Sequence, residues 1–354
     1  MAVRLVQAFG SRHKGGAQRF FLRLAGAMEE SGAQHGVIVK RNGWCEEQLR
    51  PTPVKTHSLP FGGAIDLITP VMYPRILRKA RANIVLTHLE RATKRTPDGP
   101  WIHVGRLGGY YEMKDYRHCD HLIGITPGCL DHFRKAGWTE DRIHLIPNFV
   151  PAREQNAAVV KRADFQTPDG VPLILWLGRM EHEKGPDMVV KALRDVPGAY
   201  LWMAGSGAYE ETVKALAAEL GLMDRIRFLG WRDDIHALLP AADIYICASR
   251  FEAHGNIVLE AWTHGLPIVS VRSPGPEHLI DDGRTGLLIP NEAPEAMAQA
   301  VNLLIADPAL ARRIGDAGRH KVETVYSEQA IMKQYHELFE RLLDGRARQA
   351  ANSA

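Results

Sequence analysis

A glycine turn with a glutamate on either side is the most informative stretch of this chain, SRFEAHGNIVLEAWTHG at residues 249–265. Glu252 falls in the loop, and Glu260 falls in a helix that we expect to begin with Asn256 as its N-cap and to stop at Gly265. Because the two carboxylates are eight residues apart, they cannot form a side-by-side pair on one face of a helix. We therefore expect the two glutamates to have different roles.

The turn between these glutamates has the composition of an anion-binding loop. Gly255 lets the backbone approach a ligand closely, and the amides of residues 255–258 are expected to point at an anion. The apolar run DIYICA at residues 243–248 precedes the turn and is typical of a short buried strand. The pattern predicts a phosphate-binding βα turn, with a surface loop of solvated acids as the alternative.

Two cations follow another apolar run. PLILWLG at residues 172–178 predicts a buried strand, and RMEHEKGPDMVVKAL after it is a loop that enters a helix. Arg179 and Lys184 lie in this loop as candidate anion ligands. From this segment alone, solvated surface charges are the favoured explanation for both.

Strands and helices alternate along the rest of the chain. A strand at Val3 to Ala8 is followed by the glycine-containing loop FGSRHKGG and an amphipathic helix from about Ala17 to Glu30. Further strands of the first half are expected at 35–40, 53–58, 83–87, 100–104, 121–125 and 143–147. This alternation predicts an α/β protein with parallel doubly wound sheets, whose ligands bind beyond the carboxyl ends of the strands. The Gly-Ser-Gly turn at 205–207 lacks the full glycine fingerprint of a dinucleotide site, so we interpret it as architecture.

The length of 354 residues suits two domains. Residues 149–171 interrupt the periodicity with polar residues, prolines and a glycine, as a linker does. We place a first domain at 1–160, a second at 161–327 and a terminal helix with a frayed tail at 328–354. That helix is expected to start at the cap Ser327 and to run to about Leu343, just before Gly345.

Composition restricts the function classes. The four cysteines show no CxxC spacing, which argues against a zinc site or a disulfide framework and for a reducing compartment. No signal peptide or membrane-spanning run is recognisable, so we expect a cytoplasmic protein. Residues 1–150 hold 22 Lys and Arg against 13 Asp and Glu, whereas the net charge of the whole chain is +3. No nucleic-acid motif accompanies this basic half, so an anionic membrane surface or a phosphorylated acceptor is the expected partner.

The glutamate segment, continued as FEAHGNIVLEAWTHGLPIVSVRSPGPEHLIDDGRTGLLIP, resembles the motif of the retaining glycosyltransferases of family 4, or group 1. The resemblance implies a GT-B fold: two Rossmann-like doubly wound domains with the donor site in the cleft between them. It also implies that Glu260 holds the donor ribose and that Glu252 contacts the transferred sugar. The family usually has a small and then an aromatic residue after the first glutamate, whereas this chain has Ala253 and His254.

The segment LGRMEHEKGPDMVVKAL resembles the part of the same family that grips the donor pyrophosphate. The guanidinium of Arg179 would contact two phosphate oxygens at once, and the ammonium of Lys184 would place a positive charge beside the leaving oxygen. With Glu252, these cations form the catalytic set that we predict. The resemblance places Trp231 and Arg232 beside the nucleobase, with packing as the expected role of Trp231. The full donor-binding set that it implies is Gly16, Arg179, Lys184, Trp231, Arg232, Glu252, Ala253, His254, Gly255, Asn256, Ile257 and Glu260.

Candidates for the acceptor side lie in the first half. The segment WIHVGRLGGYYEMKDYRHCDHLIGITPG resembles the family's strand and loop that commonly end in a histidine beside the reacting sugar, and Gly108 occupies the place of that histidine. Arg106 and Tyr110 flank it, and His88 ends another predicted strand. His13, in the first glycine loop, completes the acceptor-side candidates.

Together these features predict a retaining enzyme that moves a sugar from a UDP- or GDP-sugar to a hydroxyl acceptor. A lipid-linked or lipopolysaccharide glycan of the cell envelope is the expected acceptor. The adjacent acids 281–282 and 233–234 are not an Asp-x-Asp metal signature, and we expect neither a metal ion nor a cofactor. Three cations on a predicted helix at 74–81 suggest peripheral docking at the cytoplasmic face of the inner membrane, although a solvated helix face is the alternative. A non-catalytic nucleotide-sugar-binding subunit and a GT-B sugar-nucleotide epimerase remain the alternative functions.

Overall fold

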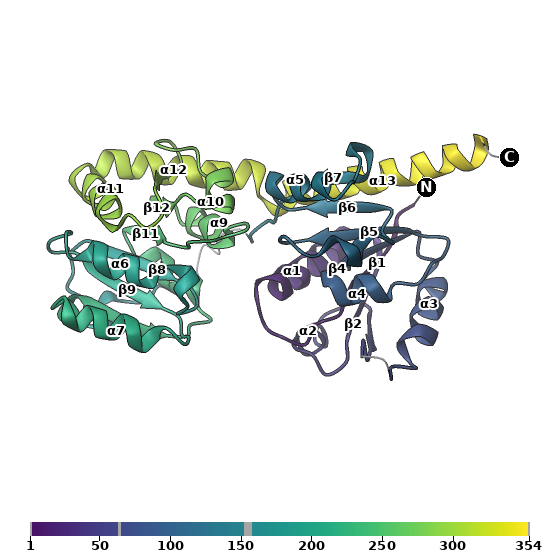
Figure 1. Ribbon diagram of the computed structural model, residues 1–354, viewed down its shortest axis with the longest axis horizontal. Coiled ribbons are helices and arrows are strands. Elements are labelled where there is room, and N and C mark those ends of the chain that lie inside the picture. Colours follow the sequence, from purple (N-terminus) through teal and green to yellow (C-terminus); the bar gives the residue numbers. More distant parts are fainter. Residues whose placement is uncertain (1, 63–64, 152–157, 353–354) are drawn as a thin grey trace. The chain divides into compact units, whose positions relative to one another are not determined.

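The computed structural model describes residues 2–62, 65–151 and 158–352, with side chains as far as Arg348. Its contacts divide the chain into two compact units, which are described separately. Unit 1 consists of Met1–Asn148 and Glu328–Ala354, and unit 2 consists of Phe149–Ser327. Within each unit, helices flank a parallel sheet (Figure 1).

Unit 1 contains a seven-stranded sheet in the order β3-β2-β1-β4-β5-β6-β7, in which every strand pairing is parallel. Its strands are β1 (Arg4–Phe9), β2 (Gln34–Lys40), β3 (Thr56–Leu59), β4 (Ile84–His88), β5 (Ile102–Leu107), β6 (His121–Gly124) and β7 (Ile143–Leu145). Its α-helices are α1 (Gly16–Glu30), α2 (Trp44–Leu49), α3 (Thr69–Lys79), α4 (Leu89–Arg95), α5 (Pro127–Lys135) and α13 (Glu328–Asn352). The strand order reverses between β1 and β4, which is the position where doubly wound sheets bind ligands.

Unit 2 contains a six-stranded parallel sheet in the order β10-β9-β8-β11-β12-β13, whose order reverses between β8 and β11. Its strands are β8 (Leu173–Leu177), β9 (Tyr200–Ala204), β10 (Ile226–Gly230), β11 (Ile244–Cys247), β12 (Ile268–Val271) and β13 (Leu287–Ile289). Its α-helices are α6 (Pro186–Leu193), α7 (Glu210–Glu219), α8 (Ile235–Leu238), α9 (Asn256–Thr263), α10 (Pro274–Leu279), α11 (Pro294–Ala306) and α12 (Pro308–Val325).

The apolar strands explain both cores. In β8, Ile174 and Trp176 point into one hydrophobic cluster of unit 2, whereas Leu173 and Leu175 point into the other. Successive side chains of a strand point to opposite faces, so an all-apolar strand must be covered on both sides. The expected fold class, two Rossmann-like α/β units, is confirmed. Among the described residues, no helix is long and apolar enough to cross a membrane.

Two expected boundaries differ from the structure. Unit 2 begins at Phe149 rather than after residue 160, because Val150 is buried in its core and the Val160 amide donates to the Ala237 carbonyl oxygen at 3.1 Å. The terminal helix α13 does not end near Leu343 with a frayed tail beyond it but continues through Gly345 to Asn352. Residues 152–157 of the expected linker lie outside the described residues.

Candidate functional site

The loops that follow β8 and β11 meet at the point where the strand order of unit 2 reverses. The loop after β8 carries Arg179 and a short 3₁₀ turn, His182–Lys184, and the loop after β11 carries Glu252. Lys184 Nζ donates to Glu252 Oε2 at 2.5 Å, and the two side chains are 23% and 20% exposed. The predicted catalytic cation and the first glutamate therefore form one accessible ion pair.

The backbone around Lys184 is fixed by close packing. Trp176 Nε1 donates to the Lys184 carbonyl oxygen at 3.3 Å. Gly185 has φ +62°, and a Cβ there would lie 2.1 Å from the carbonyl oxygen of Ala248. Only glycine allows the two loops to approach this closely. Arg179, in contrast, is exposed, and no carboxylate among the described residues forms an ion pair with it.

A half-buried arginine, which the local sequence did not indicate, holds the same loops together. Arg250 binds both carboxylate oxygens of Asp187, at 2.8 and 2.9 Å, and its amide donates to the Glu183 carbonyl oxygen at 2.8 Å. Burial alone would raise the pKa of Asp187, but the hydrogen bonds and charge of Arg250 outweigh burial, and this pKa is lowered. Arg250 also pairs with Glu292. The position of Arg250, two residues before Glu252, could have indicated that it belongs to the site. Its partner Asp187 is 63 residues away in the chain, so the local sequence could not indicate the ion pair.

A glycine turn precedes α9 as expected, but its N-cap residue and one of its amides differ from the prediction. Gly255, at φ +88°, is the N-cap in place of Asn256, which is the first helical residue. The Val258 amide already donates to the Gly255 carbonyl oxygen at 2.9 Å, so it does not point at an anion as expected. Glu260 lies on α9 and is 8% exposed. Gly265, at φ +68°, follows the helix end as predicted.

The first turn of α10 packs against this turn. The Gly275 amide donates to the Glu252 carbonyl oxygen at 2.7 Å, and a Cβ on Gly275 would lie 2.4 Å from the backbone of His254. His254 is 4% exposed, whereas its neighbour Ala253 and the helical Ile257 are half-buried. The structure therefore brings Lys184 to Glu252 and the first turn of α10 to the stretch from Glu252 to His254.

The Gly-Ser-Gly turn after β9 serves as architecture, as interpreted. A Cβ on Gly205 would lie 1.7 Å from the Gly178 carbonyl oxygen, and one on Gly207 would lie 2.3 Å from that of Met180. The Met180 amide donates to the Ser206 carbonyl oxygen at 2.9 Å. The turn thus packs backbone to backbone against the loop that carries Arg179.

The residues after β10 are more exposed than expected. Trp231 is 51% exposed and donates from Nε1 to Asp233 at 3.3 Å, so the packing role expected for it is wrong. The chain leaves the sheet at Gly230, which has φ +64°, and this turn carries the indole away from the core. Arg232 pairs with Asp234 at 2.5 Å and lies over the ring of Phe165.

Two acceptor-side candidates of unit 1 are buried. His88 is 3% exposed, bonds Gln7 Oε1 at 3.0 Å and contacts the ring of Phe21 edge-on. Its pKa is held well below the usual value, mainly by burial. The Arg106 guanidinium donates to the Tyr335 hydroxyl at 2.7 Å and also to the side chain of Asn148. Arg106 thereby ties α13 to the sheet of unit 1.

The other candidates of unit 1 are accessible. Tyr110 is 38% exposed and its ring contacts that of His132 edge-on. Gly108 has open surroundings, because a Cβ there would meet nothing closer than Ile125, at 3.6 Å. Gly16 is the first residue of α1, and a Cβ there would meet nothing within 4 Å. His13 lines a cavity at the carboxyl ends of β1 and β4.

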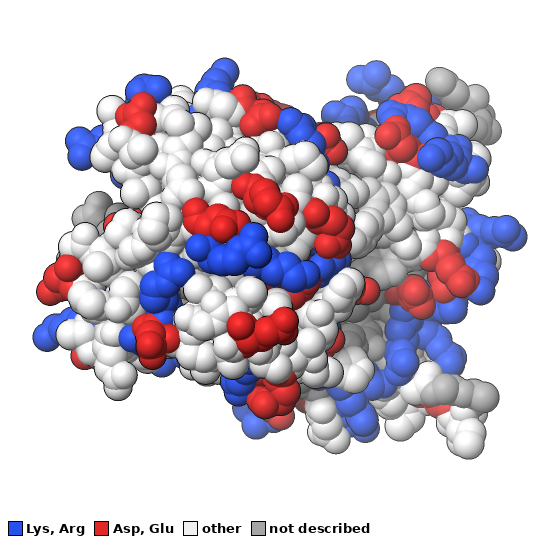
Figure 2. Space-filling model, turned by 60° about the vertical axis from the view of Figure 1, so that its left-hand side comes forward, with Lys and Arg blue, Asp and Glu red and all other residues white. Residues whose placement is uncertain are grey.

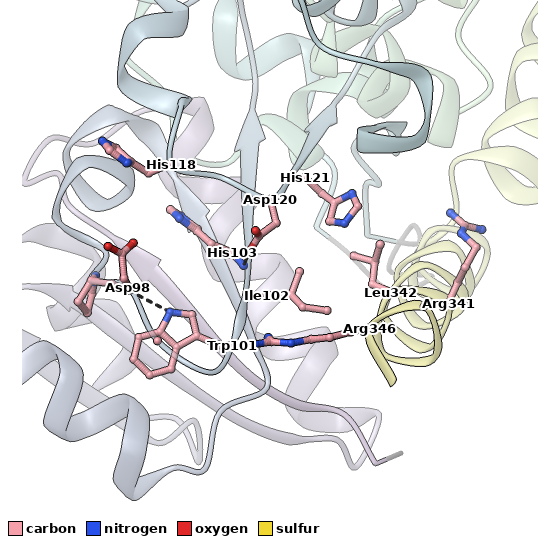
Figure 3. A pocket seen from close by; sticks show the side chains of 13 residues that line it. Asp98, Trp101, Ile102, His103, His118, Asp120, His121, Arg341, Leu342 and Arg346 are labelled. Atoms are coloured by element: carbon pink, nitrogen blue, oxygen red, sulfur yellow. Dashed lines mark hydrogen bonds between the residues drawn. The ribbon is translucent and has the colours of Figure 1, made fainter. Parts of the chain in front are cut away.

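A second cavity of about 420 Å³ lies at the opposite edge of the unit 1 sheet, where β5 and β6 begin (Figure 3). Trp101, His103 and His121 line it on the side of the sheet, and Arg341 and Arg346 line it from α13, with Arg346 extending toward Trp101. Because parallel sheets bind ligands at the carboxyl ends of their strands, this cavity is separate from the candidate reaction site.

Ion pairs compensate part of the surface charge. Figure 2 shows a face on which basic side chains lie directly beside acidic ones. In unit 2, for example, Arg272 pairs with Asp282 at 2.6 Å and Lys321 pairs with Asp281 at 3.0 Å. These two adjacent aspartates therefore form surface ion pairs. Among the described residues, no three His, Cys, Asp or Glu side chains are arranged to hold a metal ion.

Comparison with known proteins follows the same division of the chain. Residues 160–321 match the model of the glycosyl transferases group 1, and residues 14–154 match that of glycosyltransferase family 4. The lipopolysaccharide core biosynthesis glycosyltransferase LpsE of Rhizobium meliloti is 30% identical over 92% of this chain and 95% of its own length. LpsD of the same organism is 30% identical over 93% of this chain and 96% of its own length.

Solved structures share the fold. A glycosyltransferase from Rickettsia africae superposes with a TM-score of 0.86 at 22% identity, over 97% of this chain and 99% of its own. Anabaena Alr3699/HepE in complex with UDP superposes with a TM-score of 0.82 at 17% identity, over 96% of this chain and all of its own. With the full-length relatives above, these matches show that the chain belongs to the group 1, family 4-like glycosyltransferases of GT-B fold.

Proposed function

We propose that this glycosyltransferase retains the anomeric configuration and transfers a hexose from a UDP- or GDP-sugar to a hydroxyl of a cell-envelope glycan. The observation that carries the proposal is the accessible Lys184–Glu252 ion pair at the strand-order reversal of unit 2. The lipopolysaccharide core names of the two Rhizobium relatives support an envelope acceptor.

In this reaction the enzyme must above all stabilise the negative charge that develops on the departing diphosphate. Arg179 offers an exposed guanidinium that pairs with no carboxylate in the described part of the chain, and Lys184 offers an ammonium fixed by a short ion pair. Preorganised donors of this kind stabilise a developing negative charge without reorganisation, and each is worth about 3 kcal/mol. In this scheme Glu260 binds the ribose, Glu252 contacts the sugar, and no metal ion takes part.

Three alanine variants test these roles. Arg179→Ala and Lys184→Ala are expected to lower turnover by about a hundredfold or more while the thermal unfolding midpoint stays within a few degrees. Glu260→Ala is expected to weaken binding of the nucleoside diphosphate in calorimetry, since a ribose contact exists before the sugar moves. Arg194→Ala is the matched control, because this exposed arginine forms its ion pair with the adjacent Asp195.

The outcomes separate the proposal from its rivals. Near-wild-type turnover in both cation variants would refute the leaving-group assignment. A wild-type protein that binds nucleoside diphosphate but neither transfers nor hydrolyses the donor would instead be a non-catalytic binding subunit. A thermal-shift series with UDP, GDP and ADP identifies the base, because the preferred nucleotide raises the midpoint most.

Peripheral docking at the cytoplasmic face of a membrane is part of the proposal. The segment before and within α3 exposes apolar side chains, with Ile65 91%, Leu67 79% and Val71 47% exposed. On α3 itself, Arg75 and Arg78 follow Val71 at helical spacings that place all three on one face. Apolar side chains with cations beside them suit an anionic lipid surface.

A further inference from the structure

Unit 1 contains a cavity of about 670 Å³ at the carboxyl ends of β1, β2 and β4. This volume lies in the range of small-molecule sites, and the position is the strand-order reversal of the sheet. Three basic side chains, Arg12, Lys40 and Arg91, line the cavity together with one carboxylate, Glu90. The cavity is therefore electropositive.

Close backbone packing fixes the position of Arg12 between the other two cations. A Cβ on Gly10 would lie 2.9 Å from the Ala92 nitrogen and 3.1 Å from the Cβ of Arg91. A Cβ on Gly43 would lie 3.0 Å from the Lys40 carbonyl oxygen and 3.3 Å from the Cα of Arg12. The loop after β1 is thus held against both α4 and the turn that follows β2.

Lys40 is a fixed and buried charge. Its side chain is 7% exposed, and Nζ donates to the carbonyl oxygens of Pro60 at 2.7 Å and Phe61 at 2.8 Å. Arg91 donates to the same Phe61 oxygen at 3.3 Å. Burial lowers the pKa of Lys40, and repulsion from Arg91 and Arg12 lowers it further. Within the described part of the chain, no carboxylate forms an ion pair with any of the three cations.

We propose that this cavity binds a phosphate monoester on the acceptor sugar, held by Arg12, Lys40 and Arg91. This inference rests on the proposed function, because it identifies the chemical class of the acceptor for the same enzyme. Two arginine forks and a fixed ammonium match the several oxygens and double charge of a phosphate monoester better than a neutral sugar. Arg12 and Arg91 are thus specificity-determining residues.

Binding of inorganic phosphate tests the cavity without requiring turnover. The full-length Arg179→Ala/Lys184→Ala protein is used, so that donor-site cations do not contribute, and the thermal unfolding midpoint is followed at constant ionic strength. Phosphate is expected to raise the midpoint relative to chloride. Adding Arg12→Gln should weaken phosphate binding by about tenfold. The exposed Arg117→Gln, outside the cavity, is the control and should leave the phosphate effect unchanged.

The choice of anion is tested in the same variants with glucose 6-phosphate, glucuronate and glucose. Glucose 6-phosphate is expected to stabilise more than the other two sugars, and this difference should vanish with Arg12→Gln. Equal effects of phosphate with and without Arg12→Gln would overturn the inference, as would a larger effect of glucuronate. Loss of binding to anionic vesicles in Arg12→Gln, with no change in phosphate binding, would assign the cations to a lipid surface and also overturn it.

Failure of this inference is distinguishable from failure of the proposed function. If UDP or GDP stabilises the wild-type protein but phosphate does not act through Arg12, only the acceptor assignment fails. If no nucleoside diphosphate binds while phosphate still acts through Arg12, the cavity stands as an anion site and the proposed transfer reaction fails.

Discussion

In the proposed reaction, two anions compete for the Lys184 ammonium group: the Glu252 carboxylate and the diphosphate of the donor. Glu252 holds it at 2.5 Å, and both side chains are accessible to a ligand. Because charge-assisted hydrogen bonds are short and strong, an incoming diphosphate must share this ammonium with Glu252 or take it over. The pair therefore lets Glu252 control how available the cation is, in addition to the sugar contact that we propose for it.

Replacing Glu252 with glutamine is expected to leave nucleoside diphosphate affinity unchanged or tighter, because the neutral amide no longer attracts Lys184. Turnover should fall, since the sugar loses its carboxylate partner. Calorimetry with the preferred nucleotide and a donor turnover assay measure the two effects, and exposed Glu183→Gln serves as the control. A tenfold weaker nucleotide affinity in Glu252→Gln would show that the carboxylate itself supports the nucleotide.

Buried histidines predict how stability depends on pH. Burial lowers the pKa of His103 to about 4, and the nearby Asp120 carboxylate opposes this only in part. The unfolded chain has a histidine pKa of about 6.5, so between about pH 6.5 and 4 it binds a proton that the folded protein excludes. The free energy of unfolding should therefore fall as the pH falls, by about 1.4 kcal/mol per pH unit for this residue.

Urea unfolding between pH 7.5 and 5 measures this dependence. His103→Gln is expected to lose stability less steeply below pH 6.5 than the wild type, even if its stability at pH 7.5 is lower. The exposed His320→Gln should keep the wild-type slope. Identical slopes in wild type and His103→Gln would mean that His103 does not supply the excluded proton.

At the scale of elements, glycines decide how the loops of unit 2 approach one another. Three loops, after β8, β9 and β11, pack backbone to backbone at Gly185 and Gly205. Hydrogen bonds between carbonyl and amide groups then complete the contact, as between the Met180 amide and the Ser206 oxygen at 2.9 Å. The position of Arg179 and Lys184 therefore depends on turns that contribute no side chain.

Gly205→Ala is expected to destabilise the protein by several kcal/mol, because its Cβ would lie 1.7 Å from the Gly178 carbonyl oxygen in a strained φ of +152°. Chemical denaturation measures the free energy of unfolding of Gly205→Ala and of the comparison variant Gly16→Ala. Gly16→Ala should change stability by about 1 kcal/mol at most, because the added Cβ meets no atom within 4 Å. Equal unfolding midpoints in Gly205→Ala and wild type would disprove the tight contact. Reduced donor turnover in a stable Gly16→Ala protein would support a ligand at the start of α1.

At the scale of the whole molecule, the charge is unevenly distributed along the chain. Residues 1–150 carry a clear excess of cations although the net charge is only +3, and the exposed apolar side chains near α3 belong to this basic half. Both features favour an anionic, partly apolar surface as the partner of unit 1.

Flotation with vesicles tests membrane docking. Binding is expected to require anionic lipid and to weaken with salt, since each cation near such a surface is worth about 1 kcal/mol. Arg75→Gln/Arg78→Gln should reduce the salt dependence, and Leu67→Ser/Val71→Ser should reduce binding at every salt concentration. Leu303→Ser, which changes an exposed leucine of unit 2, is the control. Failure of the wild type to bind anionic vesicles at low salt would refute docking.

The local sequence was sufficient to place most of the strands and to select the candidate site residues. Apolar runs and turn residues placed the strands to within a few residues, for example β8 and β11, because these signals depend on near neighbours in the chain. The spacing of Glu252 and Glu260 and the cations of the β8 loop were visible for the same reason. A break in periodicity located the division between the units but not its boundary, which depends on the burial of Val150.

Tertiary structure decided which of these residues meet. Lys184 and Glu252 are 68 residues apart and pair only because β8 and β11 are neighbours in the sheet. Helix α13 passes through Gly345 because burial of Leu342 and Leu343 offsets the cost of about 1 kcal/mol that glycine adds to a helix. Arg106 binds Tyr335 across 229 residues, so a candidate for the acceptor side became a structural anchor. Strand order and long-range packing set all of these contacts, and neither is encoded in any short stretch of the chain.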